Sequence, residues 1–253
     1  MNQFHRFNQK SQLILSFEKP ILYLSVALLA VITISPLLDV GFTTNDDTLK
    51  GLWEHGNYWE QGFETAKYQG RFTHFTSIWL KLIPYRFGID SWFYKLSTFG
   101  MFFIACLAFG YSLKFFSKSN NTGLLGLIFV FAFIQNSWDH NLLTSYPFYY
   151  NLRFAMLMIA MVIFYKAMER ESKILLYVFA FTWFFVITEG FLQYVPIFII
   201  LILVNYYEKN KISITGVIAF SIPVVIFFII YIIFRSFFPS YYHGNILTQF
   251  NLI

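Results

Sequence analysis

Two adjacent carboxylates, Asp46 and Asp47, are the residues of this sequence best suited to chemistry. They lie in TTNDDTLKGLW, about eight residues beyond the first long apolar run. A carboxylate close to a membrane surface can act as a general base or as a metal ligand. Because adjacent side chains diverge, we do not expect the two carboxylates to share one role. The alternative interpretation is a solvated loop start, in which Asp47 or Thr48 caps the next helix.

Two arginines, Arg71 and Arg235, could bind a phosphate group, and a third arginine opens a predicted span at its outer boundary. Arg71 follows Gly70 in YQGRF, Arg153 opens the fourth apolar run and Arg235 closes the last one. Glycine permits a close approach of the backbone, and a guanidinium can bind a phosphate through two parallel hydrogen bonds. Arg71 could equally be an arginine at a helix start that binds lipid headgroups, and Arg235 could equally extend to ordinary headgroups. Spacing alone therefore leaves both interpretations open.

Three further polar residues interrupt apolar sequence. Asp139 and His140 are adjacent in NSWDHNLLTSYPFYYNLR, and such a pair could bind a divalent metal or relay a proton. The alternative for this pair is a polar loop within an aromatic interface belt. Glu189 lies in ITEGFLQY, and a carboxylate inside an apolar stretch is costly enough to be a functional candidate. Its alternative is the tip of a helical hairpin, at which Gly190 makes the turn.

The elements that must position these residues are predicted from long apolar runs. Of the 253 residues, 57% are hydrophobic and 12% are charged, whereas about 25% of the residues of a soluble domain are charged. Because backbone groups in lipid must be hydrogen-bonded within their own segment, these runs are expected to be helices. The stretch 174–206 is too long for one span and is divided at Thr188-Glu189-Gly190. We predict an all-α polytopic membrane protein with about seven transmembrane helices, at residues 20–38, 91–115, 122–138, 151–166, two within 174–206, and 213–235.

Basic residues predict the orientation of the chain. They are concentrated in short connectors such as KFFSKSNN, YKAMERESK and YYEKNK, which share one side under this assignment of spans. The positive-inside rule places that side, and the N-terminus with it, in the cytoplasm. We therefore predict one membrane domain over 1–253, with a cytoplasmic tail at 1–19, a long external loop at 39–90, helices two to seven within 91–235 and an external tail at 236–253.

The composition of the external loop and of the whole chain adds two expectations. Aromatic residues at helix-like spacing predict two or three amphipathic helices that lie on the outer membrane surface within 39–90. The net charge of +5 is explained by the orientation of the spans, and no basic–aromatic patch indicates a nucleic-acid partner. The expected partners are membrane lipids.

The order of these features resembles the C-type glycosyltransferase (GT-C) superfamily, in particular bacterial membrane proteins of the O-antigen glucosyltransferase kind and their relatives. The resemblance lies in a first span, the acidic pair of TTNDDTLKGLW, an aromatic amphipathic loop, YQGRF and a second span, and in the closing RSFFPSYYHGN. It covers most of the chain as topology and depends on short motifs. It implies a seven-span module with two external surface helices, a polyprenyl-phosphate sugar donor and an aspartate of the first loop as base or metal ligand.

Carried over to this sequence, the resemblance makes Asp46 or Asp47 the catalytic residue, with Asp46 favoured, and makes the three arginines candidates for the donor phosphate. A divalent metal ion is compatible with this chemistry. The implied function is transfer of a sugar from a polyprenyl-phosphate donor to a cell-envelope glycan or lipid acceptor, outside the plasma membrane of a bacterium. Such proteins usually continue beyond the seventh span, which leaves a truncated form or an inactive remnant open.

The alternative function is a non-catalytic transport or scaffold partner of envelope polysaccharide synthesis, such as a flippase or a partner of a polymerase. A transporter is expected to place polar residues at mid-depth and often shows repeated halves. In this sequence the middle of each apolar run is nearly free of charge and the acidic residues cluster on the predicted outer side. That distribution favours chemistry at the membrane surface over transport.

Overall fold

The computed structural model describes residues 20–33, 35, 58–70, 92–133, 148–188 and 191–239. Within these ranges every regular element is a helix, so the predicted all-α class is confirmed for the described part of the chain. The elements are the helix Pro20–Thr33, α3 (Tyr58–Gln69), α5 (Trp92–Ser117), α6 (Asn120–Phe133), α7 (Tyr149–Arg170), α8 (Lys173–Ile187), the short helix η2 (Phe191–Tyr194), α9 (Val195–Lys209) and α10 (Ile214–Phe237).

Three helices are long and apolar enough to cross a membrane, namely Lys95–Ser117 within α5, α7 and α10. At 1.5 Å per residue α7 is about 33 Å long, slightly more than the hydrocarbon core of about 30 Å. The helix Pro20–Thr33, α6 and α8 are apolar but shorter within the described ranges. These lengths identify a membrane protein, while the predicted total of seven spans is not confirmed.

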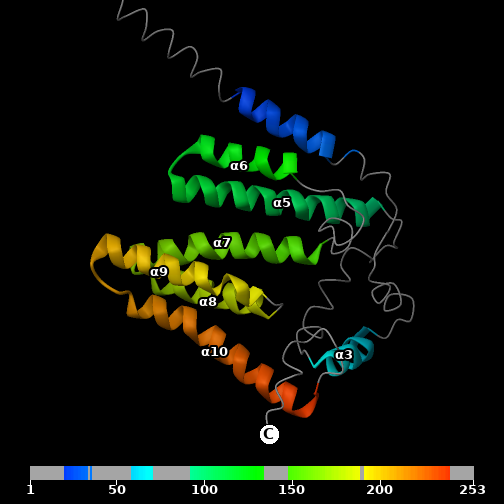
Figure 1. Cartoon of the computed structure of the whole chain (residues 1–253), viewed down its shortest axis with the longest axis vertical. Helices are drawn as coiled ribbons and strands as arrows, with labels where there is room; N and C mark the ends of the chain where they lie inside the picture. Colours follow the sequence, from blue (N-terminus) through cyan, green and yellow to red (C-terminus); the bar gives the residue numbers. More distant parts are fainter. Residues whose placement is uncertain are drawn as a thin grey trace, which may run out of the picture.

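The helices from α5 to α10 pack side by side (Figure 1), and short connectors join α5 to α6, α7 to α8 and α9 to α10. In this arrangement α5 lies between α6 and α7, and α8 packs against both α7 and α10. The predicted break within 174–206 is confirmed, because α8 ends at Ile187 and α9 begins only at Val195. The main core is aromatic and joins α7, α8, α9 and α10 through Phe164, Phe179, Trp183, Phe198 and Phe220.

Close approach between helices depends on small and hydroxylated residues, as is usual for helices in lipid. A Cβ atom on Gly123 of α6 would lie 2.7 Å from the carbonyl oxygen of Gly110 of α5, so only glycine fits there without movement of the backbone. On the other side of α5, the buried Ser112 Oγ donates a hydrogen bond to the carbonyl oxygen of Met158 in α7 at 3.0 Å. These contacts fix α5 between its two neighbours.

The bundle has two ends that differ in composition. We call the end that holds the connectors 118–119, 171–172 and 210–213 the Lys209 end, and the opposite end, where α7 begins and α10 ends, the Arg153 end (Figure 1). The described basic residues of the predicted cytoplasmic side all lie at or near the Lys209 end: Lys114, Lys118, Lys166, Arg170, Lys173, Lys209 and Lys211. The other members of the predicted set, Arg6, Lys10 and Lys19, lie outside the described residues, and the side of the membrane that the set faces stays a prediction.

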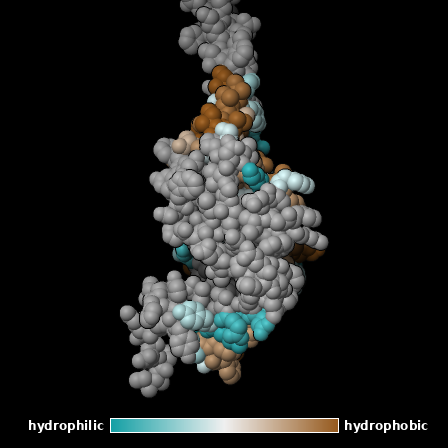
Figure 2. Space-filling view, turned by 90° about the vertical axis from the view of Figure 1, so that its right-hand side faces the viewer, coloured by the Kyte–Doolittle hydropathy of each residue, from teal (hydrophilic) through white to brown (hydrophobic). Residues whose placement is uncertain are grey.

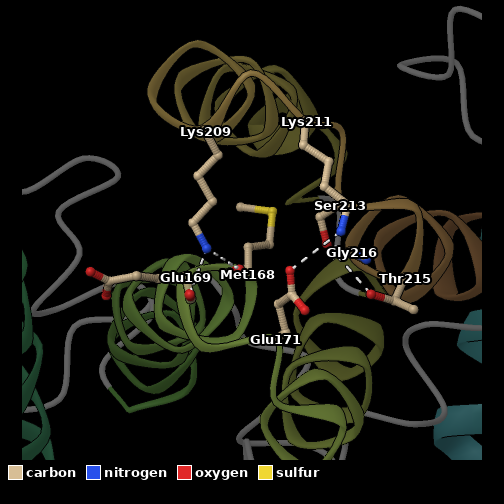
Figure 3. Close-up of polar contacts among 8 residues, drawn as sticks. All are labelled: Met168, Glu169, Glu171, Lys209, Lys211, Ser213, Thr215 and Gly216. Carbon is tan, nitrogen blue, oxygen red and sulfur yellow. Dashed lines mark hydrogen bonds and ion pairs between the residues drawn. The ribbon is translucent and has the colours of Figure 1, made fainter.

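Lys209, the last residue of α9, joins the end of that helix to the end of α7 (Figure 3). Its Nζ donates hydrogen bonds to the carbonyl oxygens of Met168 and Glu169, at 3.2 and 2.6 Å. These carbonyls belong to the last turn of α7, where the helix itself supplies no partner and where a cation is favoured by the helix dipole. Nearby, Lys211 forms an ion pair with Glu171 at 3.7 Å, and both side chains are largely exposed.

Substitution of Lys209 by methionine is expected to lower the free energy of unfolding by about 1 kcal/mol, because two carbonyls lose a charged donor. Lys211→Met removes the same charge two residues further along, in the connector after α9, yet should cost less than about 0.5 kcal/mol because its ion pair is exposed. Unfolding of the purified protein by SDS in mixed micelles measures both. Equal losses in the two variants would contradict a capping role for Lys209.

Candidate functional site

Most of the residues that the sequence selects for chemistry lie outside the described residues. This holds for the acidic pair Asp46 and Asp47, and also for Arg71, Asp139, His140 and Glu189. The described candidates are Arg153 and Arg235, which belong to α7 and α10. The geometry of the site is therefore built from these two arginines and from the helices around them.

Arg153 lies on the second turn of α7, about 6 Å along the axis from the start of the helix. Its side chain is fully buried, with 0% of its surface exposed. The sequence places Arg153 at the outer boundary of a span, and the structure adds that its side chain is buried within the bundle. The physical reason is that α8 packs along α7 and covers the face on which Arg153 lies.

The last turn of α8 supplies the immediate surroundings of Arg153. Arg153 Nη1 donates a hydrogen bond to Thr188 Oγ1 at 3.0 Å, and Thr188 in turn donates to the carbonyl oxygen of Phe185 at 2.8 Å. The guanidinium carbon lies 3.7 Å from the centroid of the Phe185 ring and 5.2 Å from that of Tyr149. Cation–π contacts of this kind are worth about 2 kcal/mol when desolvated. They therefore offset part of the free-energy cost of burying the guanidinium.

The remaining N–H donors of Arg153 have no such favourable contact. Its Nε and Nη2 atoms are buried and have no hydrogen-bond partner among the residues that the structure describes. A buried charge without a full set of partners costs several kcal/mol. These two nitrogens lie on the same edge of the planar guanidinium, and this edge offers two parallel N–H donors to a carboxylate or a phosphate.

Arg235 occupies the last turn of α10, two residues before the helix ends at Phe237. The side chain is half-buried, and its Nη1 atom is buried without a hydrogen-bond partner in the described part of the chain. Arg235 thus lies at the same end of the bundle as Arg153 (Figure 1).

The amphipathic helix α3 lies next to the end of α10, as Figure 1 shows. Lys67 of α3 lies 4.6 Å from the ring centroid of Phe63 and 5.9 Å from that of Phe238, and the two phenylalanine rings meet edge to face at 6.0 Å. A groove of about 330 Å³ lies between α3 and Phe237–Pro239 and is also lined by Glu64, Lys67 and Tyr68. One helix of the predicted set within 39–90 is thereby confirmed, and it lies at the Arg153 end.

Figure 2 shows the bundle turned so that this side faces the viewer. Hydrophilic residues gather at the bottom of the view, in the region of α3, and hydrophobic residues dominate the helix Pro20–Thr33 at the top. The exposed residues of Pro20–Thr33 include Ile21, Leu24, Leu28, Val31 and Ile32.

The structure brings together two regions that the sequence treats separately. Arg153 contacts Thr188, the first residue of the polar interruption that also contains Glu189. Sequence reasoning named Thr188 only as part of a break and missed Phe185 altogether. A signal was present, since a lone arginine inside one apolar run and a hydroxyl at the end of another are natural partners in lipid.

The structure gives no support for a metal site at the residues it covers, where no group of three or more histidine, cysteine, aspartate or glutamate side chains comes together. The carboxylates that could bind a divalent ion, Asp46 and Asp47, lie outside those residues.

Comparison with known proteins adds no relative. No protein-family model, curated protein or solved structure matches the chain. The fold and the composition together indicate a membrane protein whose described residues are all-helical and include three helices of spanning length. The resemblance to GT-C glycosyltransferases stays a prediction from the sequence.

Proposed function

We propose that this protein is a membrane glycosyltransferase that takes its sugar from a polyprenyl-phosphate donor. The observation that supports this function is the position of three segments far apart in the sequence. The helix α3 of the loop that contains the acidic pair, Arg153 at the start of α7 and Arg235 at the end of α10 all lie at one end of the bundle. A donor whose phosphate lies at a membrane surface needs cationic groups and a base on the same side.

The proposed reaction is a displacement at the anomeric carbon of the donor sugar. An acceptor hydroxyl oxygen attacks that carbon, and the bond from the carbon to the phosphate oxygen breaks. The proton of the hydroxyl passes to the carboxylate of Asp46 or Asp47, which acts as general base. The products are the glycosylated acceptor and polyprenyl phosphate, whose developing negative charge is stabilised by arginine.

Transfer of labelled sugar from a polyprenyl-phosphate donor to envelope lipid or glycan tests this function directly. The purified chain in proteoliposomes is expected to transfer label, and heat-treated protein is the control. Binding of the donor with no transfer to any envelope acceptor would instead favour the non-catalytic transport or scaffold role.

The orientation of the chain gives a separate test, because the proposed chemistry requires the acidic pair to lie outside the cytoplasm. The single cysteine, Cys106, is buried and can be removed as Cys106→Ala. In that background Asn45→Cys is expected to react with a membrane-impermeant maleimide on intact cells. Asn120→Cys, at the Lys209 end, should react only after the cells are permeabilised. The reverse pattern would exclude the proposed orientation.

A further inference from the structure

We propose that the groove between α3 and the end of α10 is a binding site for a neutral sugar. The groove has a volume of about 330 Å³ and is lined by Glu64, Lys67, Tyr68 and Phe237–Pro239. Small-molecule sites have volumes of about 300–1,000 Å³, so the groove holds a small ligand and the rest of a longer glycan would lie outside it. The inference rests on the proposed function only where it assigns this sugar to the acceptor.

The first argument is the level of the groove relative to a membrane. With 24 residues, α10 is about 36 Å long, which is more than the hydrocarbon core of about 30 Å. The end of α10 at Phe237 is therefore expected to lie near the headgroups, and α3 lies beside it (Figure 1). A sugar on an envelope glycan or lipid can reach a groove at this level without entering hydrocarbon.

The second argument is that the walls of the groove are fixed before any ligand binds. The Phe238 ring lies 6.0 Å from the Phe63 ring of α3 and 4.9 Å from the Phe234 ring of α10, measured between centroids. At the end of α3, Gly70 has a left-handed backbone with φ of 62°, and its N–H donates a hydrogen bond to the carbonyl oxygen of Lys67 at 3.0 Å. A preformed site loses less conformational entropy when its ligand binds.

The third argument is the aromatic surface of the groove. Tyr68 has 57% of its surface exposed and Phe237 has 73%. The face of an aromatic ring carries negative charge, and the C–H bonds on one face of a sugar ring are weakly positive, so the two faces stack. Exposed rings alone are also typical of an aromatic belt at a membrane surface. The groove and the charged pair beside these two rings are what indicate a ligand.

The fourth argument is the charge of the groove, which favours a ligand without net charge. Lys67 Nζ donates a hydrogen bond to Glu64 Oε1 within an ion pair, and it also lies 4.6 Å from the ring centroid of Phe63. An ionised carboxylate accepts several hydrogen bonds and an ammonium has three N–H donors, so this pair can bind hydroxyl groups, which both donate and accept. An anion would be repelled by Glu64, and a cation by Lys67.

Under the proposed function, the sugar that suits this groove is the acceptor. A donor sugar is bonded to a phosphate, so its site must adjoin a cation that is not already paired with a carboxylate. The cation of the groove is paired with Glu64. Arg235, a candidate for the donor phosphate, lies two residues before Phe237 on the last turn of α10. The acceptor and the donor phosphate would therefore bind at the same end of one helix.

Saturation-transfer NMR on the purified full chain in phosphatidylcholine nanodiscs tests sugar binding without any transfer reaction. The probes are the methyl glycosides of glucose, galactose and mannose, each compared with its uronic acid and its 2-amino counterpart. At least one neutral glycoside is expected to receive saturation at its ring C–H protons, and its charged counterparts should give signals about threefold smaller. No signal from any neutral glycoside, or equal signals from neutral and charged forms, would overturn the proposal.

Aromatic variants connect the binding to the groove. Tyr68→Ala and Phe237→Ala each remove a stacking surface and should weaken binding about threefold to tenfold, whereas Tyr68→Phe keeps the ring and should bind like wild type. The matched control is Tyr207→Ala, because Tyr207 is a tyrosine of α9 near the Lys209 end with 85% of its surface exposed. Unchanged binding in Tyr68→Ala and Phe237→Ala, or an equal loss in Tyr207→Ala, would remove the site.

Two further measurements test the charge selection and the acceptor assignment. Glu64→Gln leaves Lys67 without its carboxylate, so the uronic acid form should bind more strongly than it does to wild type; an unchanged ratio of neutral to anionic binding would contradict the role of the pair. A polyprenyl-phosphate sugar that displaces the methyl glycoside would overturn the assignment to the acceptor. Because no transfer is measured, failure of the proposed glycosyltransferase reaction alone would leave the sugar-binding result unchanged.

Discussion

Substitution of Asp46 by asparagine is expected to lower sugar transfer from a polyprenyl-phosphate donor by about 10²–10⁴-fold, the usual contribution of a general base. Asparagine keeps the size of aspartate but cannot take the proton of the attacking hydroxyl. Asp47→Asn is expected to cost less, because adjacent side chains diverge and only one of the two can face the reacting oxygen. The initial rate of label transfer at saturating donor measures both variants.

A matched control comes from the same loop. Glu60, in the first turn of α3, is an exposed carboxylate, so Glu60→Gln removes one negative charge without touching the proposed base. Its rate should stay near that of wild type. Equal turnover in wild type, Asp46→Asn and Asp47→Asn would remove the catalytic assignment. A loss in Asp47→Asn larger than in Asp46→Asn would move the base by one residue.

The three longest helices could be predicted from the sequence because apolar runs in lipid must be helical. The predicted spans 91–115, 151–166 and 213–235 correspond to α5, α7 and α10, with ends that differ by a few residues. The largest difference is at the end of α7, which continues to Arg170. There the chain leaves the helix at Glu171, which has a left-handed backbone with φ of 53°. Glycine usually occupies this position. Because Glu171 stands there instead, the sequence carries no glycine that marks the end of the helix.

The burial of Arg153 could not be predicted, since an amphipathic pattern shows which residues share a face but not what covers that face. Only the packing of α8 along α7 decides that this arginine contacts Thr188 and Phe185 instead of lipid headgroups. For the same reason the contact between α3 and the end of α10 could not be predicted from the sequence. It joins Phe63 to Phe238 across most of the chain length.

Truncation of Trp183 to alanine is expected to lower the free energy of unfolding by about 3 kcal/mol. Its side chain is fully buried at the centre of the aromatic core, 4.4 Å from the Phe198 ring and stacked on Phe220 at 6.1 Å. Apolar transfer contributes little between helices in lipid, so the loss comes mainly from dispersion contacts and from the cavity left behind. SDS-induced unfolding in mixed micelles measures the change.

Phe181 offers the control for this prediction, since it lies two residues away on the same helix with 75% of its surface exposed. Phe181→Ala should change the free energy of unfolding by less than about 0.5 kcal/mol. Trp183→Phe should fall between the two variants, because the Trp183 Nε1 has no hydrogen-bond partner in the described core and only volume is lost. If Trp183→Ala and Phe181→Ala lost the same stability, the aromatic cluster would not be what holds α8 against α9 and α10.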